Sequence, residues 1–153
     1  MRILVFSDTH GYIDNCISEV ERIGKVDMIL HAGDVSADAV DLASIFPDIP
    51  VYYVSGNCEI SRASTELEIE ADGKRIFLTH GHYYNVKYES AYTSIIRRTE
   101  GKFDVAVFGH THKPLCDNLG NLILLNPGSA RYTSTYGVIE IEDGKLRAAV
   151  LEF

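Results

Sequence analysis

The chain has 153 residues, of which 46% are hydrophobic and 24% are charged, and these values fit a single globular domain over residues 1–153. Its formal net charge of −8 argues against a general attraction to nucleic acid, and no apolar run approaches the ~18 residues of a membrane span. Three cysteines without regular spacing exclude both a disulfide framework and a CxxC zinc knuckle.

The first third of the chain predicts alternating strands and helices. Arg2–Ser7 is apolar and of strand length, and it lacks the cleavage site of a secretory signal, so we expect a first strand in a cytoplasmic protein. Apolar residues at three- and four-residue spacing predict a helix over Asp14–Ile23. A strand, a helix and a strand are then expected over Met28–His31, Ala37–Phe46 and Val51–Val54. Such units favour a parallel sheet.

The second half of the chain changes to hairpin signals. Two strand-like runs, Glu66–Ala71 and Arg75–Thr79, flank the turn-forming pair Asp72-Gly73. A helix over Tyr88–Arg98 and a buried strand over Val105–Phe108 are expected next. Three further strands are expected over Leu122–Leu125, Val138–Ile141 and Leu146–Leu151. Parallel units followed by hairpins predict two packed sheets with helices outside.

Each of five predicted strands ends in a short run of metal-binding residue types. The runs are Asp8-Thr9-His10, Gly33-Asp34, Gly56-Asn57-Cys58, His80-Gly81-His82 and Gly109-His110-Thr111-His112. Because ligands bind outside the carboxyl ends of strands in α/β sheets, we expect the five loops to converge on one cleft. Strand-end turns and surface histidines would explain any one run, but they explain five in succession poorly.

These residue types suit a pair of divalent cations. Carboxylate and amide oxygens together with imidazole nitrogens fit Mn²⁺, Fe²⁺, Zn²⁺, Co²⁺ or Ni²⁺ better than Ca²⁺ or Mg²⁺ alone. The runs offer more ligands than one ion needs, which favours two ions about 3.5–4 Å apart that share a carboxylate and a water. The glycines beside the ligands allow the backbone to turn sharply and to approach ions or phosphate closely.

Taken in order, the motifs DxH, GD, GNC, HGH and GHTH resemble those of the calcineurin-like metallophosphoesterase superfamily, and of its small YfcE-like phosphodiesterase branch. The resemblance runs from Arg2 to about Ser129 and implies a four-layer α/β/β/α sandwich with two mixed β-sheets flanked by helices. It also implies an enzyme that hydrolyses phosphate esters, most readily phosphodiesters, by means of a hydroxide held between two divalent metal ions. Mn²⁺ is the expected ion, with Ni²⁺, Zn²⁺, Fe²⁺, Co²⁺ and Mg²⁺ as alternatives.

The same resemblance implies a role for each ligand residue. One metal would be bound by Asp8, His10 and His112, and the other by Asn57, His80 and His110. Asp34 would bridge the two ions. Asp34 and Asn57 thereby also count among the catalytic residues, together with His82 and Cys58 as the candidates for help to the leaving group.

Cys58 is the one departure from the superfamily pattern. Many relatives have GNH, and that histidine is thought to contact phosphate and to protonate the leaving group. A thiol near its reference pKa of about 8.5 is a weak proton donor and a poor phosphate contact. Either another group, for which His82 is the candidate, acts as the general acid, or the enzyme favours substrates with good leaving groups.

Other polar residues have structural explanations. His31 ends an apolar strand, so a hydrogen-bonded core histidine is favoured over a ligand. Asn126-Pro127-Gly128-Ser129 is a turn by composition, with Ser129 and Arg131 as weaker candidates for phosphate contact. Cys16 and Cys116 are expected to be packing residues.

Two other classes of function compete with a small-molecule esterase. A eukaryotic retromer subunit resembles this branch and is viewed as a non-catalytic scaffold for protein interaction, but it has lost metal ligands that are all present here. A nuclease is disfavoured by the acidic charge and by the lack of a basic stripe. The expected partner is therefore a small phosphate ester, and a dimer or tetramer through exposed sheet or helix surface is compatible with the sequence.

Overall fold

Strand β1 (Arg2–Phe6) lies at the centre of a five-stranded sheet in the computed structural model, which describes all 153 residues. It runs parallel to β2 (Met28–His31), which is parallel to β3 (Val51–Tyr53). On its other side it is antiparallel to β9 (Thr135–Glu142), which forms a hairpin with β10 (Lys145–Glu152). The strand order is β10-β9-β1-β2-β3, so the sheet is mixed.

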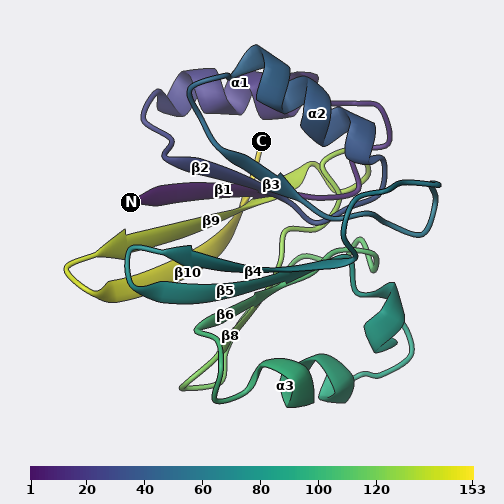
Figure 1. Ribbon diagram of the computed structural model, residues 1–153, viewed down its shortest axis with the longest axis vertical. Coiled ribbons are helices and arrows are strands. Elements are labelled where there is room, and N and C mark those ends of the chain that lie inside the picture. The colour runs from purple at the N-terminus through teal and green to yellow at the C-terminus, as the bar shows by residue number, and fades with distance from the viewer.

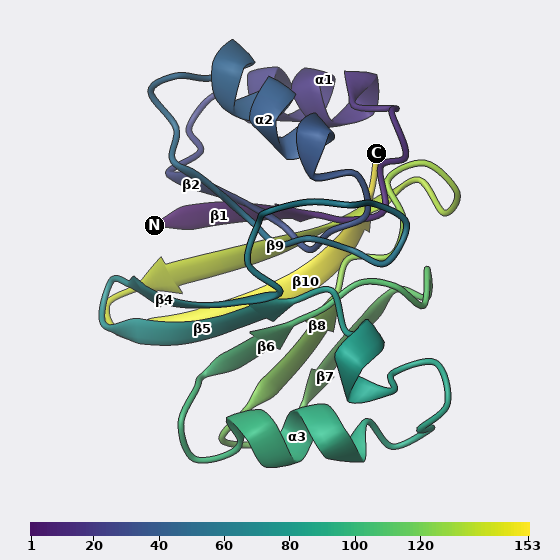
Figure 2. The same cartoon turned by 45° about the vertical axis from the view of Figure 1, so that its right-hand side comes forward.

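A second five-stranded sheet packs against the first (Figures 1 and 2). Its strands, in spatial order, are β4 (Glu66–Ala71), β5 (Lys74–Thr79), β6 (Val105–Val107), β8 (Ile123–Asn126) and β7 (Leu115–Asn118). The three inner strands β5, β6 and β8 are parallel, and the two outer strands are antiparallel to their neighbours. The hairpin predicted at Asp72-Gly73 joins β4 to β5.

Helices cover the outer face of each sheet. Helices α1 (Asp14–Ile23) and α2 (Ser36–Ile45) lie over the first sheet, and α3 (Thr93–Thr99) lies over the second (Figure 1). The predicted four-layer α/β/β/α sandwich with two mixed sheets is confirmed. None of the helices has the length and hydropathy that crossing a bilayer requires.

The alternation of side chains along β1 explains how the layers are held together. Ile3 and Val5 point into the apolar layer between the two sheets, whereas Leu4 and Phe6 point into the layer beneath α1 and α2. Because both faces of this strand are buried, its sequence is a continuous apolar run rather than an alternating one. A third apolar cluster, around Phe77, lies beneath α3.

The helix expected over Tyr88–Arg98 begins five residues later than predicted. Tyr92 has a left-handed backbone, with φ of 52°, and helix α3 starts directly after it. The Glu89 carboxylate accepts hydrogen bonds of 2.8 Å from both the backbone N–H and the hydroxyl of Ser94, so it caps the new helix. A short 3-10 helix, η1 (His82–Tyr84), precedes this segment and was not predicted.

The cysteines differ in their surroundings. Cys16 is fully buried under α1, as expected of a packing residue. Cys116 is exposed on β7, so the expectation that it packs was wrong; its thiol donates to the carbonyl of Ala148, 3.3 Å away. Cys58 is also exposed, within the loop between β3 and β4.

Candidate functional site

The five predicted ligand loops follow strands β1, β2, β3, β5 and β6 and emerge on the right-hand side of Figure 1. Within each sheet these strands are parallel, so their carboxyl ends share one edge. Backbone hydrogen bonds join neighbouring loops: the N–H of Asp8 donates to the carbonyl oxygen of Gly33 (3.0 Å), and the N–H of Gly109 donates to the carbonyl oxygen of His80 (3.1 Å). The N–H of His110 donates to Asp8 Oδ2 at 3.1 Å and so links the two sheets.

The backbone of these loops is strained where the ligands lie. Five of the seven predicted metal ligands have a left-handed backbone: Asp8, His10, Asp34, His110 and His112, with φ between 47° and 67°. Residues other than glycine rarely adopt this conformation, and it costs on the order of 1–3 kcal/mol at each position when the surroundings impose it. Such strain clusters at functional sites.

The side chains of the first predicted ligand group lie close together. Ligand atoms of Asp8, His10 and His112 all lie within 4.8 Å of one another. His112 Nε2 is 3.1 Å from Asp8 Oδ1, and Asp8 is fully buried. His10 Nε2 is a buried nitrogen without any hydrogen-bond partner. A buried polar atom without a partner is costly, and a cation among these atoms would satisfy it.

The second group brings three electron-pair donors together. His80 Nδ1 lies 2.7 Å from the carbonyl oxygen of Ala32, which can only accept, so Nδ1 donates there and Nε2 is the nitrogen left for a metal ion. That Nε2 lies 3.0 Å from Asn57 Oδ1 and 3.5 Å from Asp34 Oδ1. In the neutral imidazole, the lone pair of Nε2 and the two oxygens would face one another, and a cation among the three atoms would be their common partner.

Asp34 lies between the two groups, as a bridging ligand must. Its Oδ1 faces His80, and its Oδ2 is 3.9 Å from His10 Nε2. Burial opposes ionisation of this carboxyl, but the pKa of Asp34 is lowered because His80, the N–H of Cys58 and His10 favour the carboxylate. Asp8, Asp34 and His80 also have ligand atoms within 4.8 Å of one another, so the two groups are continuous.

His110 is placed less closely than the other predicted ligands. It belongs to neither of these close groups; its ring centroid lies 4.9 Å from that of His80. Burial, followed by the charges of His80 and Lys87, lowers the pKa of His110 to about 4. The imidazole is therefore neutral near pH 7, which is the form that binds a metal.

Cys58 and His82 border the group around His80. Burial and the neighbouring Asp34 raise the pKa of the Cys58 thiol, which keeps it protonated near neutral pH. The ring of His82 is 5.4 Å from that of His80, and its Nδ1 is buried without a partner. Burial and the charge of His80 lower the pKa of His82, so it is neutral near pH 7.

Two of the predicted glycines are required by close packing against ligand side chains. A Cβ on Gly56 would lie 2.0 Å from Asp34 Oδ1 and 2.4 Å from the Asp34 nitrogen. A Cβ on Gly109 would lie 2.0 Å from Ser7 Oγ and 2.7 Å from Asp8 Oδ2. These glycines therefore bring backbone up to the carboxylates rather than to open space.

Two carboxylates that position the ligand loops were missed from the sequence. Asp38 on α2 accepts from Thr9 Oγ1 (2.5 Å) and from the N–H of Gly11 (2.8 Å), which fixes the loop of Asp8 and His10. Glu59 accepts from Gly56 and from Ser36, the first residue of α2, and so ties the Asn57 loop to the helix that follows Asp34. The only hint of such a role in the sequence is that Glu59 directly follows the Gly-Asn-Cys motif.

His31 and Ser129 are internal supports. The fully buried His31 accepts from the N–H of Gly33 at 3.2 Å and lies 3.0 Å from Thr9 Oγ1, so the prediction of a hydrogen-bonded core histidine is confirmed. Ser129 is also fully buried; its hydroxyl donates to the carbonyl of Asp8 at 2.8 Å, so it has no access to a substrate phosphate.

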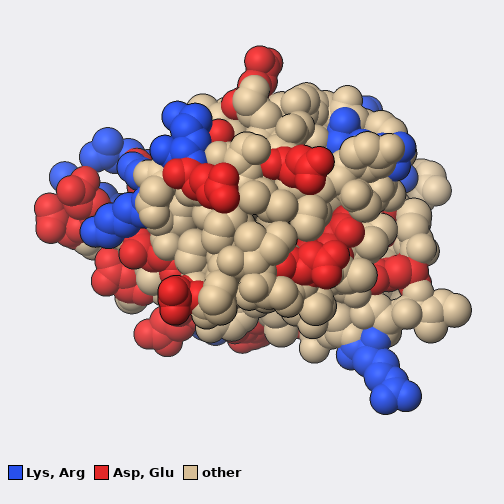
Figure 3. All heavy atoms as spheres, turned by 90° about the horizontal axis from the view of Figure 1, so that it is seen from above, with Lys and Arg blue, Asp and Glu red and all other residues tan.

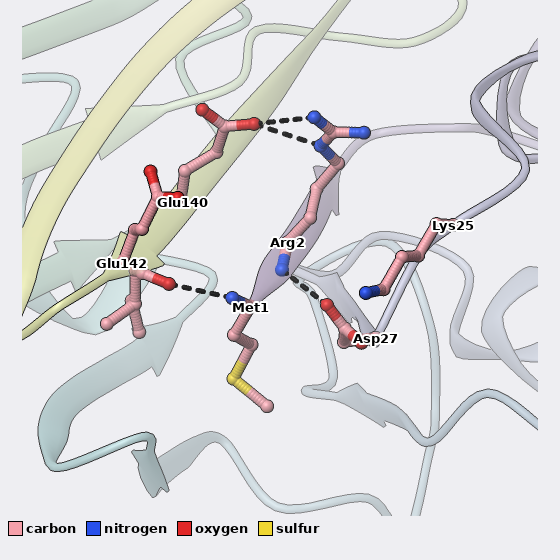
Figure 4. A pocket seen from close by; sticks show the side chains of 7 residues that line it. Met1, Arg2, Lys25, Asp27, Glu140 and Glu142 are labelled. Atoms are coloured by element: carbon pink, nitrogen blue, oxygen red, sulfur yellow. Dashed lines mark hydrogen bonds and ion pairs between the residues drawn. The ribbon is translucent and has the colours of Figure 1, made fainter.

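A separate cavity of about 360 Å³ lies at the opposite edge of the first sheet (Figure 4). Several of the polar groups that line it bind one another: the Arg2 guanidinium pairs with Glu140 at 2.9 Å, and the backbone N–H of Arg2 donates to the Asp27 carboxylate. The N-terminal ammonium donates to the carbonyl of Ile141. This cavity contains none of the predicted site residues.

Comparison with known proteins places the chain in a family. Residues 1–144 match the model of the calcineurin-like phosphoesterase superfamily domain. A probable metallophosphoesterase of Bacillus subtilis is 30% identical over 151 residues, which cover 94% of this chain and 86% of the relative. A phosphodiesterase of Methanocaldococcus jannaschii is 27% identical over 173 residues, covering 99% of this chain and 100% of the relative.

A solved structure shows the same fold. Vps29 of Entamoeba histolytica, complexed with zinc, superimposes with a TM-score of 0.74 at 22% identity, covering 99% of this chain and 98% of that one. The geometry of the loops, the fold and the family model agree, and the chain belongs to the calcineurin-like phosphoesterase superfamily.

Proposed function

We propose that this protein hydrolyses phosphate esters, most readily phosphodiesters, with two divalent metal ions bound at the five ligand loops. The observation that carries the proposal is the close approach of Asp34, Asn57 and His80 ligand atoms beside the buried, partnerless nitrogen of His10. Family membership supports phosphoester hydrolysis, and the similarity to an archaeal phosphodiesterase supports a diester substrate.

In this proposal each residue has the role that the resemblance assigned to it. Two bound dications would supply a water of lowered pKa and positive charge against the phosphoryl oxygens. The hydrogen bond from His80 Nδ1 to Ala32 fixes the imidazole so that Nε2 faces the site. The donor types favour Mn²⁺, with Ni²⁺, Zn²⁺, Fe²⁺, Co²⁺ and Mg²⁺ as alternatives. One ion would be held by Asp8, His10 and His112 and the other by Asn57, His80 and His110, with Asp34 shared between them.

The leaving group receives little help from a protein acid in this proposal. Cys58 keeps its proton, and neutral His82 is a weak donor, because its pKa is lowered. His82, whose buried Nδ1 has no partner, would be the remaining candidate for a hydrogen bond to the departing oxygen. Substrates whose leaving group departs without protonation, such as aryl diesters, are therefore expected to react fastest.

A non-catalytic scaffold is the second candidate, because the fold is shared with Vps29. The filled ligand positions and the strained backbone around them favour catalysis, because a scaffold has no need for either.

The surface charge bears on the nuclease alternative. Figure 3 shows the face over α1 and α2, where acidic and basic side chains are interspersed without a continuous basic stripe. Together with the net charge of −8, this disfavours a nucleic-acid substrate.

One experiment tests the proposal. The protein is stripped with a chelator, reloaded separately with each divalent metal, and assayed on bis(p-nitrophenyl) phosphate, with metal content measured by elemental analysis. We expect two equivalents of metal and turnover with Mn²⁺. Asp34→Asn should lose both metal and activity, whereas Asp41→Asn, the same change at an exposed position on α2, should keep both. Metal binding without turnover on any ester would favour the scaffold instead.

A further inference from the structure

Two tyrosines and an arginine form a stack at the edge of the first ligand group. The Arg131 guanidinium carbon lies 4.1 Å from the ring centroid of Tyr12 and 5.0 Å from that of Tyr132. Tyr132 stacks on His112, with centroids 5.4 Å apart and an interplanar angle of 19°, and it lies equally far from the ring of His10. The stack therefore joins the rim of the site directly to two metal-ligand candidates.

Arg131 is held in place but its charge is not neutralised. Nη1 donates to the carbonyl oxygen of His10 at 3.1 Å, and the two tyrosine rings restrain the guanidinium through cation–π contacts. No carboxylate lies within ion-pairing distance of Arg131, although the chain has 22 acidic residues and only 14 basic ones. An exposed, preorganised and unpaired guanidinium beside a site for phosphate esters is suited to an anionic group.

The free N–H groups of Arg131 and its anchor on the chain indicate which part of the substrate this arginine would meet. Nη1 is the one nitrogen with a hydrogen-bond partner, the carbonyl oxygen of His10, so the remaining N–H groups of Arg131 are available for hydrogen bonds to oxygen. Its anchor is the backbone of His10 rather than a ligand side chain, so it stands outside the group of Asp8, His10 and His112. We propose that Arg131 binds a second anionic group of the substrate, a phosphate beyond the one that is cleaved, and so selects phosphoesters that carry an additional phosphate.

This inference rests on the proposed function and has a test that can fail separately. Two substrates are compared that share the scissile diester and the leaving group: p-nitrophenyl thymidine 5′-phosphate and its 3′-phosphorylated counterpart. In the Mn²⁺-loaded wild-type protein, the additional phosphate should lower KM by about tenfold, the lower range for a charged hydrogen bond. Arg131→Gln should abolish that advantage, so that the two substrates have equal KM values, and Arg131→Lys should restore part of it, because it keeps the charge but not the planar donor fork.

Arg97→Gln is the matched control, because Arg97 is an exposed arginine on α3, outside the five ligand loops, and takes part in no ion pair. It removes the same charge and should leave both KM values unchanged. Equal losses on the two substrates in Arg131→Gln, or a fall in kcat, would mean that Arg131 contacts the scissile phosphate or only supports the loop, and would overturn the inference.

A binding measurement separates this inference from the proposed function. If the wild-type protein cleaves neither substrate, calorimetric titration with thymidine 3′,5′-bisphosphate and thymidine 5′-monophosphate still reports on the subsite. Tighter binding of the bisphosphate by about tenfold, lost in Arg131→Gln, would support the subsite without catalysis. Equal affinities for the two nucleotides would refute it.

Discussion

Replacing Gly56 by alanine is expected to displace a bridging ligand without touching any functional group. The added Cβ would lie 2.0 Å from Asp34 Oδ1, and also 2.4 Å from the nitrogen and 2.7 Å from the Cα of Asp34. Ordinary contacts of such an atom begin near 3.4 Å, so the Asn57 loop and the Asp34 backbone must separate by about 1 Å. A rotation of the Asp34 side chain cannot relieve this clash, because two of the three atoms belong to the backbone.

The expected consequence is a loss of metal binding larger than the loss of stability would explain. Overpacking of this kind costs about 1–3 kcal/mol of unfolding free energy. Displaced ligand supports typically reduce metal affinity by about 10- to 100-fold. Metal affinity is measured by calorimetric titration of the stripped protein with Mn²⁺, and unfolding free energy is measured by urea titration of the same sample.

Gly144→Ala is the matched control for this substitution. Gly144 has a φ of 74° in the β9–β10 turn, with no atom within 4 Å of an added Cβ. Backbone strain alone should therefore cost about 1 kcal/mol, with Mn²⁺ affinity unchanged. If Gly56→Ala bound Mn²⁺ as tightly as the wild-type protein, the close packing of Gly56 on Asp34 would have no part in metal binding.

Three further predictions follow from the site and its supports. Burial lowers the pKa of His31 to about 4, so between pH 6.5 and 4 this histidine is protonated in the unfolded chain but not in the folded protein. Lowering the pH from 7 to 5 should therefore cost the metal-free protein about 2 kcal/mol of unfolding free energy through this residue, and urea titrations of His31→Gln should not show that loss. Cys58→His should raise the rate on esters with poor leaving groups relative to aryl esters, and identical rate ratios in the two proteins would rule out a leaving-group role for position 58. Asp38→Asn should weaken Mn²⁺ binding by about 10-fold through the loop of Asp8 and His10, whereas Asp41→Asn should not, as judged by calorimetry.

The ligand loops could be predicted because a simple rule connects them. Asp8, Asp34, Asn57, His80 and His110 each follow an apolar run of strand length, and parallel strands bring their carboxyl ends to one edge. The rule specifies which loops meet, but not which atoms. The resemblance implied that His110 binds the same ion as His80, whereas the structure brings the two rings together without including His110 in a close ligand group.

The supports of the loops could not be predicted in the same way. Asp38 bonds to Thr9 across 29 positions of sequence, and Glu59 bonds to Ser36 across 23. An acidic residue in the first turn of a helix already has a local explanation in the helix dipole, so Asp38 gives no signal of a tertiary role. The start of α3 was misplaced for a related reason, because the cap comes from Glu89, which lies outside the helix.

The structure favours a site that is rigid before any ion binds. Asp38 and Ser129 hold the loop of Asp8 and His10, Glu59 holds the loop of Asn57, and Ala32 orients His80. None of these contacts involves the lone pairs that face one another in the site. The fold therefore holds these electron-pair donors close together at a cost in free energy, and a pair of cations is the charge that would recover it. Without an ion, the carboxylate of Asp34 has the N–H of Cys58 and the neighbouring imidazoles of His80 and His10 as its partners, and a bound ion would also supply a partner to the buried Nε2 of His10.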